Sequence, residues 1–224
     1  MSDFMVKRLI LKDWYFHRFT IVGYLAIGAV ALALLATGGE GSFFAGSILL
    51  ITVLISLGIH LAMATVVAER TEQTLPFVMS LPISPREYTT AKILANMLIF
   101  LVPWVTLVLG TFAVIAGRPG VPKGLIPYFA LILTEIFVSY CVILGVALVS
   151  ESQAWTIGAM VLGNLAFNAF LYWVAHIPAI AASMKTNSIV WSPLILRLLS
   201  AELATVVVLL GLTFFLQNRK TDFI

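Results

Sequence analysis

Six stretches of mainly apolar residues follow one another along the chain, with short polar segments between them. They cover residues 19–37, 43–67, 91–116, 126–149, 154–175 and 198–216. A helix needs about 20 residues to cross a hydrocarbon layer about 30 Å thick. It also satisfies its own backbone hydrogen bonds, which lipid cannot do. The pattern therefore predicts an all-α, polytopic membrane protein with six transmembrane helices, forming a single transmembrane domain over residues 1–224.

The first 18 residues have a different pattern, in which basic residues alternate with large apolar and aromatic ones. The members of this set are Phe4, Lys7, Arg8, Leu9, Ile10, Leu11, Lys12, Trp14, Tyr15 and Arg18. Aromatic and basic side chains suit the headgroup zone of a membrane. We therefore expect an N-terminal interfacial amphipathic helix over residues 1–18 that leads into the first span.

The composition agrees with a membrane protein and narrows the choice of partners. The chain is 61% hydrophobic and 10% charged, whereas soluble domains carry about 25% charged residues. The net charge is +3, but the basic residues are distributed between the apolar stretches. A nucleic-acid binder would cluster them on one face, so we expect membrane lipid and no nucleic acid as a partner. The single Cys141 excludes a disulfide framework within the chain.

The distribution of Lys and Arg predicts the orientation. If the N-terminus is inside, nine basic residues lie in inner segments and four in outer ones. The inner ones are Lys7, Arg8, Lys12, Arg18, Arg70, Arg86, Lys92, Arg219 and Lys220, and the outer ones are Arg118, Lys123, Lys185 and Arg197. Both termini are then cytoplasmic. Residues 176–197 form an external loop that is apolar for a loop, and it either re-enters the membrane edge or lies on the headgroups.

The polar segment between the second and third spans, residues 68–90, is the most informative. Charged residues open and close it, and apolar residues from Leu75 to Leu81 recur at roughly helical spacing. Pro82 restricts the chain to a turn, and Ser84 with Glu87 matches a capping box that starts the next helix. We expect a short helix on the cytoplasmic surface, which either docks into a groove of another protein or rests on the headgroups.

This segment resembles the signature of type-two ABC exporter permeases, the membrane subunits of ATP-driven exporters. The residues that carry the resemblance are Glu69-Arg70, Thr74-Leu75, Ser80-Leu81-Pro82-Ile83-Ser84, Glu87-Tyr88 and Lys92. Six spans, inner termini, the N-terminal amphipathic helix and an apolar loop between spans five and six are also similar to that family. The resemblance implies a cytoplasmic coupling helix within residues 71–81 that sits in a cleft of the ATPase subunit. The implied coupling residues are Glu69, Arg70, Thr74, Leu75, Val78, Met79, Leu81, Glu87 and Lys92.

The same resemblance implies the partners. The chain has no G-x-x-x-x-G-K-[ST] phosphate loop, so we expect no enzymatic activity of its own. A separate ABC ATPase subunit would bind the ATP and Mg, and a second permease copy, identical or a sister chain, would complete the path. The implied location is the bacterial plasma or inner membrane. The apolar spans favour an amphipathic, lipid-like or peptide substrate, exported from the cytoplasm.

Several polar residues fall inside the predicted spans, where such groups are costly and often functional. Glu135 lies near the middle of the fourth span. Its alternatives are a substrate contact, a proton-linked site, a buried pair across a dimer, or a protonated or hydrogen-bonded packing residue. Asn164 and Asn168 lie one turn apart on the fifth span, where they either bond across helices or line a substrate path. We expect Glu202 and Arg197 to flank the outer start of the sixth span as interfacial anchors. The histidines lack metal-ligand spacing, and we expect no metal site.

Two other classes of function stay open: a non-transport intramembrane enzyme and a membrane assembly scaffold. An enzyme would need paired carboxylates, an H-E-x-x-H motif or a nucleophile with a base inside the bundle. Glu135 alone does not supply any of these.

Overall fold

The computed structural model describes residues 2–37, 39–71 and 85–219. Within these residues the chain is helical and contains no strand. The elements are α1 (Ser2–Ala36), α2 (Glu40–Ala62), the π-helical turn η1 (Met63–Val67), α3 (Ala68–Thr71), α5 (Pro85–Gly117), α6 (Leu125–Ser150), α7 (Gln153–Ala175), α8 (Pro178–Ser183) and α9 (Pro193–Asn218).

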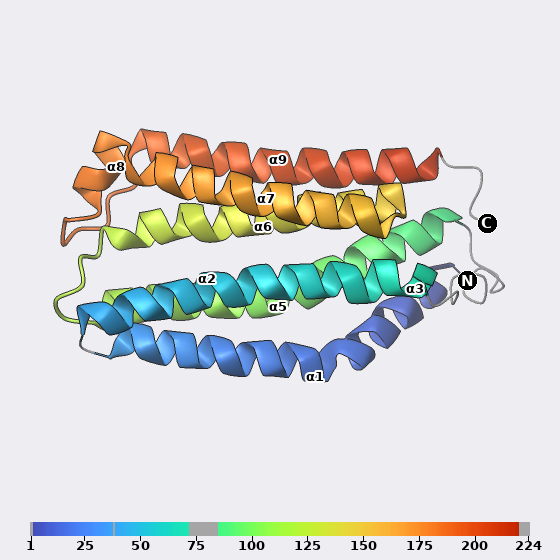
Figure 1. Ribbon diagram of the computed structural model, residues 1–224, viewed down its shortest axis with the longest axis horizontal. Coiled ribbons are helices and arrows are strands. Elements are labelled where there is room, and N and C mark those ends of the chain that lie inside the picture. Colours follow the sequence, from blue (N-terminus) through green and yellow to red (C-terminus); the bar gives the residue numbers. More distant parts are fainter. Residues whose placement is uncertain (1, 38, 72–84, 220–224) are drawn as a thin grey trace.

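Six helical segments are long and apolar enough to cross a membrane, which confirms the six predicted spans. They are Val6–Ala36, Glu40–Val67, Glu87–Gly117, Leu125–Ser150, Gln153–Ala175 and Pro193–Gln217. The chain is therefore a multi-pass membrane protein. The start of α1 and the end of α9 lie at the same end of the bundle, as an even number of spans requires (Figure 1).

The six long helices form two groups of three (Figure 1). In one group α1 packs against α5 and α2, and in the other α6 packs against α9 and α7. The two groups meet mainly where α2 packs on α6. The apolar span of α6 is 67% buried, whereas that of α7 is 11% buried. Because α6 lies at the centre, a polar group on it is shielded from lipid, and the exposed apolar faces of α7, α9 and α1 are suited to contact lipid.

The N-terminal segment is not a separate helix. Residues 2–18 belong to α1, which continues without a break into the first span. No Pro or Gly occurs between Ser2 and Arg18 to end a helix there. Figure 1 shows α1 bending towards its N-terminal end. Arg18 lies 3.9 Å from the ring centroid of Tyr15 and 4.7 Å from that of Phe19, a pairing that suits the headgroup zone.

The outer connection between α7 and α9 is partly helical and packs on the bundle. Ile180 of α8 is fully buried in a small apolar cluster with Leu131, Val174 and Ile195. The last helix begins at Pro193, five residues before the predicted start, because the Ser192 hydroxyl accepts a hydrogen bond from the backbone N–H of Ile195 and caps it. Glu202 is therefore well inside this helix.

Candidate functional site

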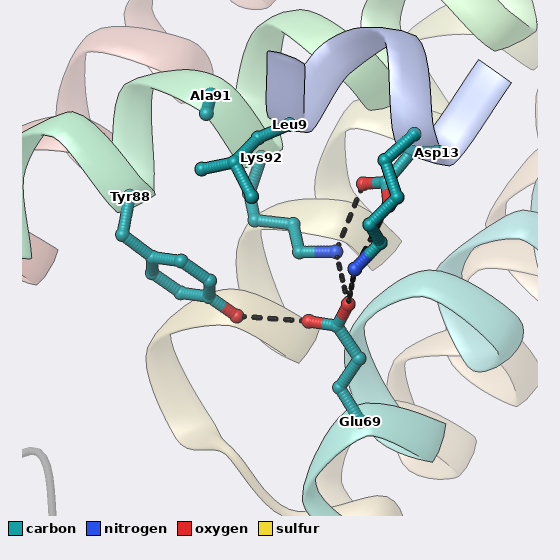
Figure 2. A pocket seen from close by; sticks show the side chains of 7 residues that line it. Leu9, Asp13, Glu69, Tyr88, Ala91 and Lys92 are labelled. Carbon is teal, nitrogen blue, oxygen red and sulfur yellow. Dashed lines mark hydrogen bonds and ion pairs between the residues drawn. The ribbon is translucent and has the colours of Figure 1, made fainter. Parts of the chain in front are cut away.

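A cluster of charged side chains is buried at the end of the bundle where α1 begins. It joins α1, α3 and the first turns of α5 (Figure 2). These elements come from both sides of residues 72–84, because α3 ends before that segment and α5 begins after it. The cluster therefore ties together the two flanks of the segment for which a coupling helix is predicted.

Lys92 lies at the centre of the cluster and is 4% exposed. Its Nζ is 2.8 Å from Glu69 Oε1 and 2.9 Å from Asp13 Oδ2, and it donates a hydrogen bond to the Thr65 carbonyl at 3.1 Å. An ammonium group has three donors, and here each has an acceptor. Full pairing of this kind is what offsets the cost of removing the charge from water.

Glu69 is held from three sides. In addition to Lys92, it accepts from Lys12 Nζ at 3.3 Å, and the Tyr88 hydroxyl donates to its Oε2 at 3.1 Å. Burial alone would raise the pKa of the Glu69 carboxyl, but Lys92 and Lys12 outweigh it and hold that pKa below its ordinary value. Glu69 is thus a charged, fixed anchor.

The cluster balances its own charge. Lys12 and Lys92 supply two positive charges, and Asp13 and Glu69 supply two negative ones. The space between them is about 10 Å³, and a cavity needs about 10–15 Å³ for a single water. The cluster therefore has no room for a substrate, and it acts as a structural junction.

The π-helical turn η1 helps to build the junction. The backbone N–H of Ala68 bonds to the carbonyl of Met63, five residues earlier, so the helix is locally wider than an α-helix. Such turns occur often at functional sites. Here the turn brings the Thr65 carbonyl to Lys92 Nζ.

A buried polar network connects the cluster to the second group of helices. Asn96 is fully buried and donates to the Lys92 carbonyl at 3.0 Å, and the Thr65 hydroxyl donates to its Oδ1 at 2.7 Å. From α6, the Tyr140 hydroxyl donates to the Asn96 carbonyl at 3.1 Å. The network therefore links η1, α5 and α6.

The structure brings together two of the predicted coupling residues, Glu69 and Lys92. Glu87 is half-buried in the first turn of α5, and Arg70 lies in α3. The other five predicted residues lie outside the described residues; they are Thr74, Leu75, Val78, Met79 and Leu81.

The predicted intramembrane residues do not join the cluster. Glu135 is half-buried on α6. Asn164 and Asn168 are exposed on α7, where Asn168 Nδ2 donates to both the carbonyl and the Oδ1 of Asn164 at 2.8 Å. In this structure the two asparagines bond to each other along one helix. Because both are exposed, the prediction that they bond to another helix is not tested.

Sequence reasoning missed Asp13, Thr65, Asn96 and the role of Tyr88. One signal was present: Asp13 and Lys92 are ionisable residues next to or within apolar spans, and such groups usually pair with one another. Glu202 was predicted to be an interfacial anchor, but it is buried within α9, where it is 7% exposed.

Comparisons of this chain with models of protein families, with curated proteins and with solved structures find no match. The geometry of the site is therefore the basis for its functional interpretation.

Proposed function

We propose that this chain is the transmembrane permease subunit of an ABC exporter, with both termini in the cytoplasm of a bacterial cell and ATP hydrolysed by a separate subunit. The observation that carries this proposal is the Lys92 junction. Glu69 precedes residues 72–84 and Lys92 follows them, and their side chains are 2.8 Å apart.

The junction suits the transmission of force. A partner that pushes on residues 72–84 acts on α3 and α5 together, because Lys92 of α5 is ion-paired with Glu69 of α3. Asp13 adds α1 to the same unit. Rigid elements that move together are a common means of coupling in transporters. The ATPase movement would thus tilt α1, α2 and α5 as one body against α6, α7 and α9.

A lipid-like or amphipathic substrate is supported by a groove between α6 and α9. It has a volume of about 320 Å³, which lies in the range of small-molecule sites, about 300–1,000 Å³. Its lining is almost wholly apolar: Val142, Gly145, Val146, Val149, Ser150, Trp155, Leu209, Leu212, Thr213 and Leu216. It occupies the halves of both helices nearest to the Lys92 junction, where an acyl chain from the inner leaflet can enter.

One observation favours the alternative of an intramembrane enzyme: Glu135 on α6 and Glu202 on α9 are two carboxyl groups on helices that pack together. Catalysis requires that such a pair reach a substrate. Glu202 is 7% exposed, so the pair is closed to a peptide or ester, and the transport function is the better supported of the two.

The test is co-purification with candidate ABC ATPases from the same organism, from membranes in which this chain and one candidate are expressed together. The wild-type chain is expected to retain the ATPase, and a Leu75/Val78/Met79 triple alanine variant is expected to lose it. Glu40→Gln is the matched control, since Glu40 is exposed at the opposite end of the bundle. If the wild-type and triple variant chains both purify without an ATPase, the proposal fails.

A further inference from the structure

A second buried charged residue lies within the membrane-spanning part of the bundle. Glu202 on α9 is 7% exposed, and neither of its carboxyl oxygens has a hydrogen-bond partner in the described part of the chain. Buried polar groups nearly always have such partners, and an unpaired carboxylate in hydrocarbon is very costly. Something that the protein's own side chains do not supply must neutralise this group.

Glu202 lies on α9 at the level of another carboxyl group, that of Glu135 on α6. Helices α6 and α9 pack together, and both begin at the same end of the bundle (Figure 1). Further along helices α6 and α9, a Cβ on Gly145 would lie 2.7 Å from the Thr213 hydroxyl. This register places Glu135 and Glu202 at the same level.

That level is near the middle of the membrane. Glu135 and Glu202 occur about ten residues after the starts of their helices, which corresponds to about 15 Å at about 1.5 Å per residue. The hydrocarbon core is about 30 Å thick. Neither water nor headgroups are therefore expected to solvate the pair.

Among the described residues, no basic side chain pairs with it. Helices α6 and α7 contain no Lys or Arg, and α9 contains only Arg197. Arg197 is exposed, and five residues correspond to about 140° around a helix, so it faces away from Glu202. Lys92 on α5 is already bonded to Asp13 and Glu69.

The other titratable side chains on the long helices around the pair also make no hydrogen bond or ion pair with it in the described residues. They are Glu40, His60, Glu87, Tyr88, Tyr128, Tyr140, Cys141 and Tyr172. A metal ion such as Ca²⁺ takes about 6–8 oxygen ligands, and the pair offers only its own two carboxyl groups. A proton needs a single oxygen.

We propose that Glu135 and Glu202 form an intramembrane proton-binding site. Glu202 carries the proton as a neutral carboxylic acid, and the half-buried Glu135 is the second carboxyl group of the site. A negative charge that forms on Glu135 as the pH rises opposes ionisation of Glu202 and so retains the proton on Glu202. The proton can leave when α9 separates from α6 and water reaches the pair. The site does not depend on an ATPase partner, so this proposal can be tested independently of the proposed function.

The test uses dicyclohexylcarbodiimide, a hydrophobic reagent that modifies protonated carboxyl groups. The purified full-length protein in lipid nanodiscs is treated over a range of pH, and modified peptides are mapped by mass spectrometry. Glu202 is expected to be modified at neutral pH, and the modification is expected to disappear at alkaline pH. In Glu135→Gln it should disappear at a lower pH, because the charge that retains the proton is gone. Glu40→Gln should leave the profile unchanged.

Infrared spectroscopy covers the case in which the reagent cannot reach the pair. Wild-type protein should show the carbonyl band of a protonated carboxyl group at neutral pH, and Glu202→Gln should lose it while unfolding at the wild-type temperature. If both the band and the modification are absent at neutral pH, the proposal is wrong. If Na⁺, K⁺ or Ca²⁺ protects Glu202 from modification at constant pH and ionic strength, the site binds a metal ion and the proton assignment is overturned.

Discussion

Glu69 Oε1 and Lys92 Nζ lie 2.8 Å apart, and the segment 72–84 separates them in the sequence. The pair closes the base of this segment, and both side chains are largely removed from water. Asp13 extends the ion pair to α1. Three helices therefore share one charged junction at the end of the bundle where α1 begins.

Replacing Lys92 with Met should strongly destabilise the protein. Asp13 and Glu69 would be left buried without their main partner, and removing one member of a buried ion pair costs about 3–5 kcal/mol. The free energy of unfolding in mixed micelles measures this. The triple variant Lys92→Met, Asp13→Asn, Glu69→Gln should recover much of the loss, because neutral side chains do not require a counter-ion. A single Lys92→Met variant as stable as the wild type would show that the junction contributes little.

Acid should weaken the junction through Glu69. The pKa of this carboxyl is lower in the folded protein than its ordinary value of 4.5, so the folded state binds the proton less readily than the unfolded state. Its stabilisation is then fully present above pH 4.5 and is lost as the pH falls through the folded-state pKa. Thermal unfolding temperatures measured from neutral pH downward should show this loss in the wild type. Glu69→Gln should lack that component, and identical pH profiles for the two proteins would contradict the assignment.

The contact between α1 and α2 depends on Gly46. A Cβ at this position would lie 2.8 Å from both the Ala31 carbonyl oxygen and the Leu35 backbone nitrogen. Because these are backbone atoms, Gly46→Ala should force the helices apart and cost about 1–3 kcal/mol. Gly23→Ala is the control, since nothing lies within 4 Å of its added Cβ, and it should be neutral or stabilising by up to about 1 kcal/mol. Equal unfolding free energies for both variants would argue against this close helix contact.

Tyr140→Phe should have a modest effect. It removes the hydrogen bond to the Asn96 carbonyl, worth about 0.5–1.5 kcal/mol, but keeps the ring stacked on Phe100 at a centroid distance of 4.0 Å. Unfolding in mixed micelles measures the change. A loss as large as that of Lys92→Met would mean that the hydroxyl does more than bond to Asn96.

Much of the fold follows from the sequence, because lipid imposes a simple rule on the length and polarity of spanning helices. All six spans are present. The first begins at Val6 and not at residue 19, because α1 continues through the N-terminal segment, whereas the other inner boundaries lie within four residues of prediction. The start of α9 was predicted five residues too late, since the apolar pattern weakens at Arg197 although Ser192 and Pro193 already begin the helix. That error placed Glu202 at the membrane surface instead of inside it.

The site was only partly predictable. Glu69 and Lys92 stand out because they belong to one motif, but the motif does not say that they bond to each other. Asp13 is far from both in the sequence, and only the packing of α1 on α5 brings it to Lys92. The π-helical turn that turns the Thr65 carbonyl towards Lys92 has no sequence signal that we can identify. Contacts between segments that are distant in the sequence are therefore the part of the site that could not be predicted from the residue pattern.

We propose that the Lys92 junction transmits the movement of the proposed ATPase partner to the spans. The most direct measurement is ATP hydrolysis by the chain and the ATPase co-purified in lipid, comparing wild type, Glu69→Gln and the control Glu40→Gln, with the ATPase content of each preparation determined. We expect Glu69→Gln to retain the bound ATPase but to lose most of the hydrolysis that depends on this chain, whereas Glu40→Gln should behave as wild type. Unchanged permease-dependent hydrolysis in a folded Glu69→Gln complex would contradict it.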